Sequence, residues 1–213
     1  MSKALALAGV TLLAVTAARA TDLVDPPSVH VNDVWKYNRT DGFTDEVTSV
    51  MTVRVVEISD NEIISKQDGR SENANKTILL YTDRLWNVVD NAETKFTPSI
   101  SYYRWPVHPG DSYTIDYAGS ALKTGATAAC RNIVNVTGEE KVTVPAGTFD
   151  SVRFDITSEC RSPGTDATIY HHKVSSWYSS AVNRFVKLTD STMADGRVRL
   201  RYEFDLVEYK PAP

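Results

Sequence analysis

The chain has 213 residues, a formal net charge of −4 and a hydrophobic fraction of 42%, which suits a globular protein with a real core. It carries no basic excess, whereas nucleic acids and anionic membrane surfaces select proteins with a basic face. We therefore expect neither of them as a partner.

The first twenty residues have the features of a signal peptide. Lys3 supplies the positive charge, Ala4–Ala17 is an unbroken run of small and apolar residues, and Ala18-Arg19-Ala20 is an A-x-A cleavage site. The run has 14 residues, whereas a membrane-spanning helix needs roughly 20. Cleavage after Ala20 would leave 21 basic against 27 acidic residues, a net charge of −6.

The remaining chain, 21–213, is long enough for one large β domain and contains no second apolar run that could span a membrane. We expect a soluble mature protein in the periplasm or outside the cell.

Strand patterns dominate the mature chain. At its C-terminal end, Val198, Leu200, Tyr202, Phe204 and Leu206 alternate with charged residues, and such a period of two puts one row in a core and the other toward water. Further strands are expected at Trp35–Arg39, Val47–Ser59, Ile63–Ile64, Lys76–Tyr81, Ser101–Arg104, Tyr113–Tyr117, Ile133–Thr137, Val152–Thr157, Thr168–Tyr178 and Arg184–Leu188.

The predicted fold is all-β: one large antiparallel sheet of about 10–12 strands, either curved as a half-barrel or folded over as a sandwich. Helix is limited to short turns, with Asp83–Val89 as the plausible one. The small and polar segment Ala118–Ala129 is expected to be a mobile loop.

One short pattern occurs twice. The segment His30–Trp35 resembles His108–Tyr113, and in both an Asn or Gly that tolerates positive φ precedes an Asp that can bond backbone N–H groups. Two readings stay open: two similar halves, 28–107 and 108–210, produced by duplication, or one turn type used twice.

The two cysteines, Cys130 and Cys160, are expected to form a disulfide in an oxidising compartment. Both have the parity of the inward row of their strands. A hairpin around Pro145–Phe149 would place Cys160 opposite residue 134 or 136, so we expect a bulge near Gly138-Glu139-Glu140 or a diagonal approach to absorb the offset.

Four strings in order carry a family resemblance: N-D-V-W-K-Y-N-R-T-D-G-F, W-P-V-H-P-G-D-S-Y, V-P-A-G-T-F-D-S-V-R and S-W-Y-S-S-A-V-N-R-F-V-K. Over about residues 28–209 the chain resembles a family of Gram-negative periplasmic proteins classed as domains of unknown function. The resemblance implies an antiparallel sheet protein of the cell envelope, loosely similar to the lipoprotein-carrier half-barrels. It implies no activity and no catalytic residues, and the cysteine pair departs from its pattern.

No catalytic, metal or cofactor site is predicted. His171 and His172 are neighbours on a strand, so their side chains diverge and cannot chelate one ion together. Ser120 and Lys123 match S-x-x-K, but that motif needs a helix behind the serine. Glu139 and Glu140 also diverge on a strand.

Aromatic residues are the remaining positive signal. Trp105, Trp177, Tyr103, Tyr202 and Phe204 are the candidate ligand contacts, because such side chains can line a lipid or glycan pocket, although they can equally be core. The functional hypothesis is a non-enzymatic envelope protein that binds an apolar or amphipathic ligand, or acts as an adaptor between envelope partners. The alternative is a hydrolase acting on cell-wall or glycan material.

We predict that the exported protein begins at Thr21, because signal peptidase cleaves after an A-x-A site. N-terminal sequencing of the exported protein checks this. A membrane-retained full-length chain, or a different first residue, would contradict it.

Overall fold

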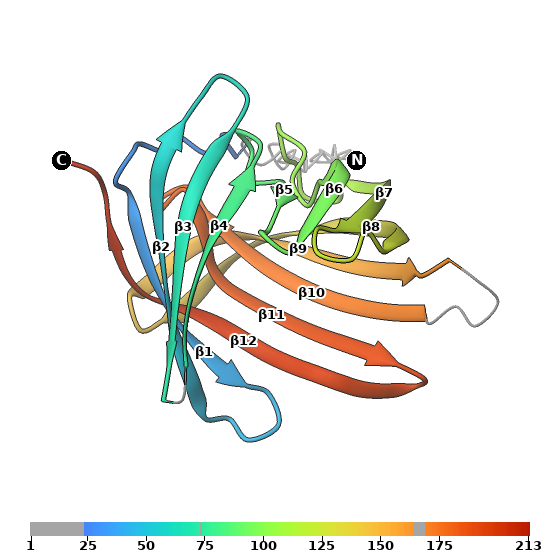
Figure 1. Cartoon of the computed structure of the whole chain (residues 1–213). Helices are drawn as coiled ribbons and strands as arrows, with labels where there is room; N and C mark the ends of the chain where they lie inside the picture. Colours follow the sequence, from blue (N-terminus) through green and yellow to red (C-terminus); the bar gives the residue numbers. More distant parts are fainter. Residues whose placement is uncertain (1–23, 73, 164–168) are drawn as a thin grey trace, which may run out of the picture.

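The computed structural model describes residues 24–72, 74–163 and 169–213. In this part of the chain twelve antiparallel strands follow one another, and each pairs with the next (Figure 1). They are β1 (Val34–Asp41), β2 (Val47–Ile58), β3 (Ile63–Ser71), β4 (Asn75–Thr82), β5 (Val88–Asp90), β6 (Thr94–Ile100), β7 (Ser112–Ala121), β8 (Thr127–Val144), β9 (Gly147–Arg161), β10 (Ile169–Ser179), β11 (Arg184–Ala194) and β12 (Arg197–Lys210).

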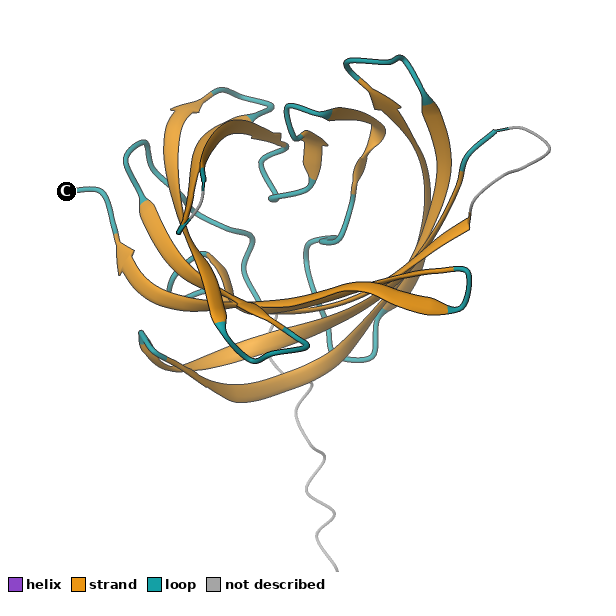
Figure 2. Ribbon diagram, turned by 60° about the horizontal axis from the view of Figure 1, so that its bottom comes forward, coloured by secondary structure: helices purple, strands orange, loops and turns teal. Residues whose placement is uncertain are grey.

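The sheet closes on itself because β1 also pairs with β12, from Val34 opposite Lys210 to Asp41 opposite Tyr202. The strands therefore encircle an interior, as Figure 2 shows from another direction. The predicted all-β antiparallel fold is confirmed, but the sheet is a closed barrel and neither a half-barrel nor a sandwich. Closure satisfies both sheet edges with backbone hydrogen bonds.

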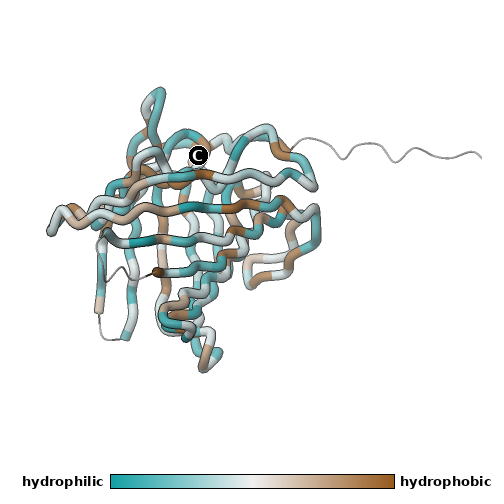
Figure 3. The backbone as a smooth tube through the Cα atoms, turned by 90° about the vertical axis from the view of Figure 1, so that its right-hand side faces the viewer, coloured by the Kyte–Doolittle hydropathy of each residue, from teal (hydrophilic) through white to brown (hydrophobic). Residues whose placement is uncertain are grey.

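Alternating burial shows which row of each strand faces inward. On β1, Trp35 and Tyr37 are completely buried while their neighbours are partly exposed. On β9, the predicted row of Val152, Phe154 and Ile156 is buried in the same way. The alternation appears in Figure 3 as hydrophobic and hydrophilic residues following one another along the strands.

Three local expectations are wrong. Asp83–Val89 contains turns and the start of β5 instead of a helical turn, because Asp83 accepts backbone N–H bonds from Leu85 and Asn87. Ser101–Arg104 lies outside the strands, just after β6. Most of Ala118–Ala129 is paired strand in β7 and β8, so the connecting loop is short.

The described residues include no helix that is long and apolar enough to cross a bilayer. Thr168, expected to begin a strand, lies outside the described residues.

The repeated turn has one geometry in both places. The backbone N–H of Asp33 donates to the carbonyl of His30, and that of Asp111 to the carbonyl of His108, both at 3.1 Å. Each aspartate in turn accepts from the N–H of its histidine, at 2.8 and 2.9 Å. The preceding Asn32 and Gly110 have φ of 80° and 91°. That the halves 28–107 and 108–210 arose by duplication stays a prediction.

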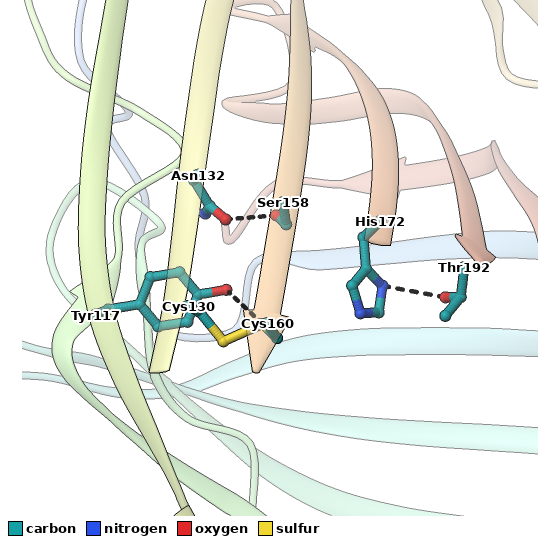
Figure 4. Close-up of a disulfide and its surroundings, with 7 residues drawn as sticks. All are labelled: Tyr117, Cys130, Asn132, Ser158, Cys160, His172 and Thr192. Carbon is teal, nitrogen blue, oxygen red and sulfur yellow. Dashed lines mark hydrogen bonds between the residues drawn. A yellow bond between two sulfur atoms is a disulfide. The ribbon is translucent and has the colours of Figure 1, made fainter. Parts of the chain in front are cut away.

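A disulfide joins Cys130 on β8 to Cys160 on β9, directly opposite each other with their Cα atoms 4.1 Å apart (Figure 4). The offset between the two cysteines is smaller than we expected from the sequence, because the turn between β8 and β9 is tight and Val144 already pairs with Gly147. One register shift between Val136 and Gly138 removes the rest. The bulge therefore lies at the start of the predicted region.

We predict that replacing both cysteines with serine lowers the free energy of unfolding by roughly 3–4 kcal/mol, because the bond closes a loop of about 30 residues in the unfolded chain. Urea denaturation of the oxidised protein with and without reductant measures the difference. Tyr117→Phe is the control, since the Tyr117 hydroxyl lies 3.8 Å from the Cys160 sulfur but takes no part in the bond. An unchanged midpoint on reduction would contradict the prediction.

Candidate ligand-binding site

The barrel interior contains a cavity of about 320 Å³ that is partly open to solvent. Aliphatic side chains from β2, β4, β5, β6 and β11 line it together with aromatic rings from both halves of the chain. The aromatic residues that line the cavity include Trp86, Tyr103, Tyr178, Phe185, Tyr202 and Phe204.

The rest of the interior is filled by packed side chains. Trp35 stacks on Tyr209 with centroids 5.4 Å apart and meets Trp86 edge-on at 5.6 Å. Tyr37 stacks on Phe185 at 4.6 Å. We call this group of rings the packed end of the interior; two of its members, Trp86 and Phe185, also line the cavity.

Three aromatic side chains hold the connection between β10 and β11. The indole of Trp35 donates to the carbonyl of Val182, that of Trp86 to Asn183, and the hydroxyl of Tyr37 to Phe185, each at 2.8 Å. We call this set the aromatic clamp. It fixes the backbone carbonyls directly before and directly after Arg184, those of Asn183 and Phe185.

Arg184 is a buried cation at this packed end of the cavity, with 6% of its surface exposed. Its guanidinium carbon lies 4.4 Å from the ring centre of Trp86, 5.2 Å from Phe185 and 5.5 Å from Trp35. An unpaired buried charge costs several kcal/mol, and cation–π contacts return about 2 kcal/mol when desolvated. The rings therefore offset only part of the cost.

A bulge explains how Phe185 reaches the cavity although Leu188 and Asp190, which also line it, have the opposite parity along β11. Trp177 pairs with Lys187, but the next residue, Tyr178, pairs with Phe185, so Val186 is the extra residue on β11. A bulge bends the strand and redirects side chains at that point. Phe185 then faces the same cavity as Leu188 and Asp190, and Arg184, at the start of β11, lines it too.

Asp190 is the single carboxylate among the described residues that line the cavity. It accepts a hydrogen bond from the Tyr202 hydroxyl at 2.9 Å, while its other oxygen, Oδ1, is buried without a partner. Burial raises the pKa of Asp190, and the bond from Tyr202 opposes the shift.

Tyr103 is anchored at both ends. Its backbone N–H donates to the side chain of Asn87 at 2.9 Å, and Asn87 donates back to its carbonyl at 3.0 Å. At the ring's far end the hydroxyl shares a hydrogen bond of 2.8 Å with Ser176. The wall that Tyr103 forms is therefore pre-organised.

Three of the five aromatic candidates line the cavity: Tyr103, Tyr202 and Phe204. Trp105 stands one layer behind, with its ring centre 4.9 Å from that of Tyr178. Their part in ligand contact is taken up below as a proposal.

Trp177, which we expected on the concave face, lies on the outer face of β10, in the row opposite to Val174, Ser176 and Tyr178. There its ring stacks under Arg153, 5.1 Å from the guanidinium carbon, and its indole N–H donates to Glu140.

Val198 and Leu200, which we expected in the inward row, are exposed over 44% and 41% of their surfaces. The pairing of β1 with β12 stops at Tyr202, so the earlier residues of β12 belong to a hairpin that extends beyond the closed ring.

Sequence reasoning missed Arg184, Asp190 and Trp86. The quoted string S-W-Y-S-S-A-V-N-R-F-V-K contains Arg184, which has the same parity along β11 as Leu188 and Asp190, so alternation was the signal that could have found it. Within the described residues, no group of three or more His, Cys, Asp or Glu side chains is arranged to hold a metal ion.

The fold and the cavity define a closed antiparallel barrel with a partly filled interior, and solved structures share this fold. A presumed lipoprotein from Parabacteroides distasonis aligns with a TM-score of 0.55 and 16% identity, over 88% of this chain and 100% of its own. A presumed exported protein with a YmcC-like fold from Bacteroides fragilis aligns with a TM-score of 0.52 and 12% identity, over 88% and 99%. The hypothetical lipoprotein YmcC of Escherichia coli reaches 0.46 at 13% identity, over 85% of each chain.

At these identities the first two alignments show a common fold and nothing beyond it. No family model matches the sequence, and no curated protein matches it. The resemblance to a periplasmic family is thus supported at the level of the fold, and the family itself stays a prediction.

We predict that Asp190→Asn is more stable than the wild type at pH 7. A carboxyl whose pKa is raised by folding contributes stability below its unfolded pKa, about 3.9, and loses it as the pH rises through the folded pKa. The advantage of the asparagine variant should therefore disappear below about pH 4.

Denaturant unfolding at a series of pH values measures this. Asp116→Asn is the control of opposite sign, because a hydrogen bond from Arg131 lowers the pKa of exposed Asp116. Equal stabilities of wild type and Asp190→Asn at pH 7 would contradict the prediction.

Proposed function

We propose that this protein is a non-enzymatic component of the cell envelope that binds one apolar or amphipathic molecule in the barrel interior. The observation that carries the proposal is the cavity itself: aliphatic and aromatic walls with a few fixed polar groups, as in small-molecule sites generally. Tyr103, Tyr202 and Phe204 are the proposed aromatic contacts, with Trp105 supporting the wall behind Tyr103 and Tyr178.

The volume restricts the ligand to small molecules. About 320 Å³ is at the lower end of the range of roughly 300–1,000 Å³ for small-molecule sites. It equals the space of about ten water molecules at roughly 30 Å³ each. A single acyl chain suits such a volume, whereas a lipid with several chains exceeds it.

The carboxylate content favours binding over hydrolysis. Cleavage of a glycan usually requires a pair of carboxylates that flank the scissile bond. Among the described residues lining the cavity, Asp190 is the single carboxylate, so such a pair is not present there. We therefore rank the hydrolase hypothesis below the binding hypothesis.

An envelope location agrees with the signal-peptide pattern of residues 1–20 and with the two structural neighbours, a presumed lipoprotein and a presumed exported protein. The lipid class of ligand also agrees with an envelope protein, because acyl chains are abundant there.

We predict that the protein binds single-chain alcohols of 8 to 12 carbons, with an affinity that rises by about 0.8 kcal/mol per buried methylene until the cavity is full. Leu188→Ala, which removes an aliphatic wall of the cavity, should weaken binding by about 1–3 kcal/mol. Titration calorimetry below the micelle concentration measures both.

Trp177→Ala is the matched control, since Trp177 lies on the outer face and should leave the affinity unchanged. Absence of saturable binding at every chain length would refute the proposed function, and the surface-adaptor hypothesis would then take its place.

A further inference from the structure

We infer that the ligand of this cavity is a monocarboxylic acid with an apolar chain, and that its carboxylate pairs with Arg184. This inference rests on the proposed function and names the chemical class of ligand that the same site takes.

The guanidinium of Arg184 has unmet hydrogen-bonding capacity. Both Nε and Nη1 are buried without a partner, and in the described residues no salt bridge involves this arginine. Trp35, Trp86 and Phe185 offer ring faces, which attract the charge but provide no oxygen or nitrogen acceptor. The Tyr37 hydroxyl also lies near the guanidinium: burial raises the pKa of Tyr37 and Arg184 opposes that rise, but Nε and Nη1 of Arg184 stay without a partner. A buried donor of this kind normally has an acceptor.

The surroundings keep Arg184 in place at the cavity wall. The aromatic clamp fixes the carbonyls of Val182, Asn183 and Phe185. Two of its rings, Trp35 and Trp86, also cover the guanidinium together with the ring of Phe185. With 6% of its surface exposed, the side chain has no alternative position in bulk water. The site is therefore built before any ligand arrives.

A carboxylate is the anion that matches this site best. Arginine is permanently protonated and forms strong, charge-assisted hydrogen bonds with carboxylate and phosphate oxygens. One arginine balances one negative charge. A phosphate monoester with a second negative charge would leave that charge buried and unpaired, which is strongly unfavourable.

The remaining lining sets the direction of the ligand. Asp190 lies six residues further along β11, roughly 20 Å away at the rise of a strand, and a carboxylate is repelled from it. Leu188 and the aliphatic residues of the opposite strands lie in the same cavity. The acid would thus lie with its head at the packed end and its chain along the apolar walls.

The test compares dodecanoate, 1-dodecanol and dodecyl phosphate by titration calorimetry in chloride-free buffer at pH 7, with the exported protein. We expect dodecanoate to bind roughly 10- to 100-fold more tightly than dodecanol, as one charged hydrogen-bonded contact predicts. Arg184→Met should remove the difference, mainly by weakening dodecanoate, while Arg184→Lys should keep part of it.

A second measurement does not depend on the variants folding. The carboxyl carbon of bound [1-¹³C]dodecanoate should keep the chemical shift of the ionised form at pH values where the free acid is protonated, because a nearby cation lowers a carboxyl pKa. A bound acid that titrates at or above the pKa of the free acid would overturn the inference.

The outcomes separate the two levels of the claim. Equal affinities for acid and alcohol would overturn the carboxylate inference and leave the proposed function standing, and tighter binding of dodecyl phosphate would replace carboxylate with phosphate. Absence of binding by all three probes would refute the proposed function and the inference together.

Discussion

The aromatic clamp is the interaction on which the rest of the interior depends. Trp35 and Tyr37 come from the first strand and Trp86 from the turn before β5, yet all three donate to one short stretch of backbone near residue 183. Each bond is buried or partly buried, where an unsatisfied donor would cost roughly 1–3 kcal/mol. The clamp thus joins chain segments about 100 to 150 residues apart and fixes the packed end of the barrel.

A barrel of twelve strands has more interior than its own inward-facing side chains can fill evenly, since about eight strands already give an interior that side chains just fill. Two devices reduce the space. The large rings of Trp35 and Tyr37 close the packed end, and the segment 101–107 turns inward and places Tyr103 and Val107 in the core, with 6% and 1% of their surfaces exposed. What they leave unfilled is the cavity.

Much of the fold could be predicted from the sequence because it follows from periodicity and turn chemistry. The alternation on β9 and β12 identifies strands. The turns at Asn32 and Gly110 contain the same pair of hydrogen bonds, which are the ones that their residue types favour. Closure of the ring could not be predicted, because it depends on pairing between β1 and β12, the first and last strands of the barrel, which are far apart in sequence.

The candidate site was harder to predict because it lies where regular alternation ends. Trp177 was placed inward and lies outside, while its neighbour Tyr178 lines the cavity. A bulge of one residue in β11 brings Phe185 to the same cavity, and no local sequence pattern indicates that bulge. Tyr202 and Phe204 line the cavity as the alternation of β12 indicates, because the pairing of β12 with β11 is regular along that stretch.

The two charged residues that line the cavity agree better with the proposed binding function than with a role in stability. Arg184 and Asp190 each have buried polar atoms without a partner. Replacing a buried ionic group with an apolar side chain of similar size is often neutral or stabilising, so stability alone gives no reason to keep either charge. Departures from good core design are expected where a protein has a function to perform. The position of Arg184 in a partly open cavity agrees with the proposed ligand, whose carboxylate would complete the hydrogen bonds of the guanidinium.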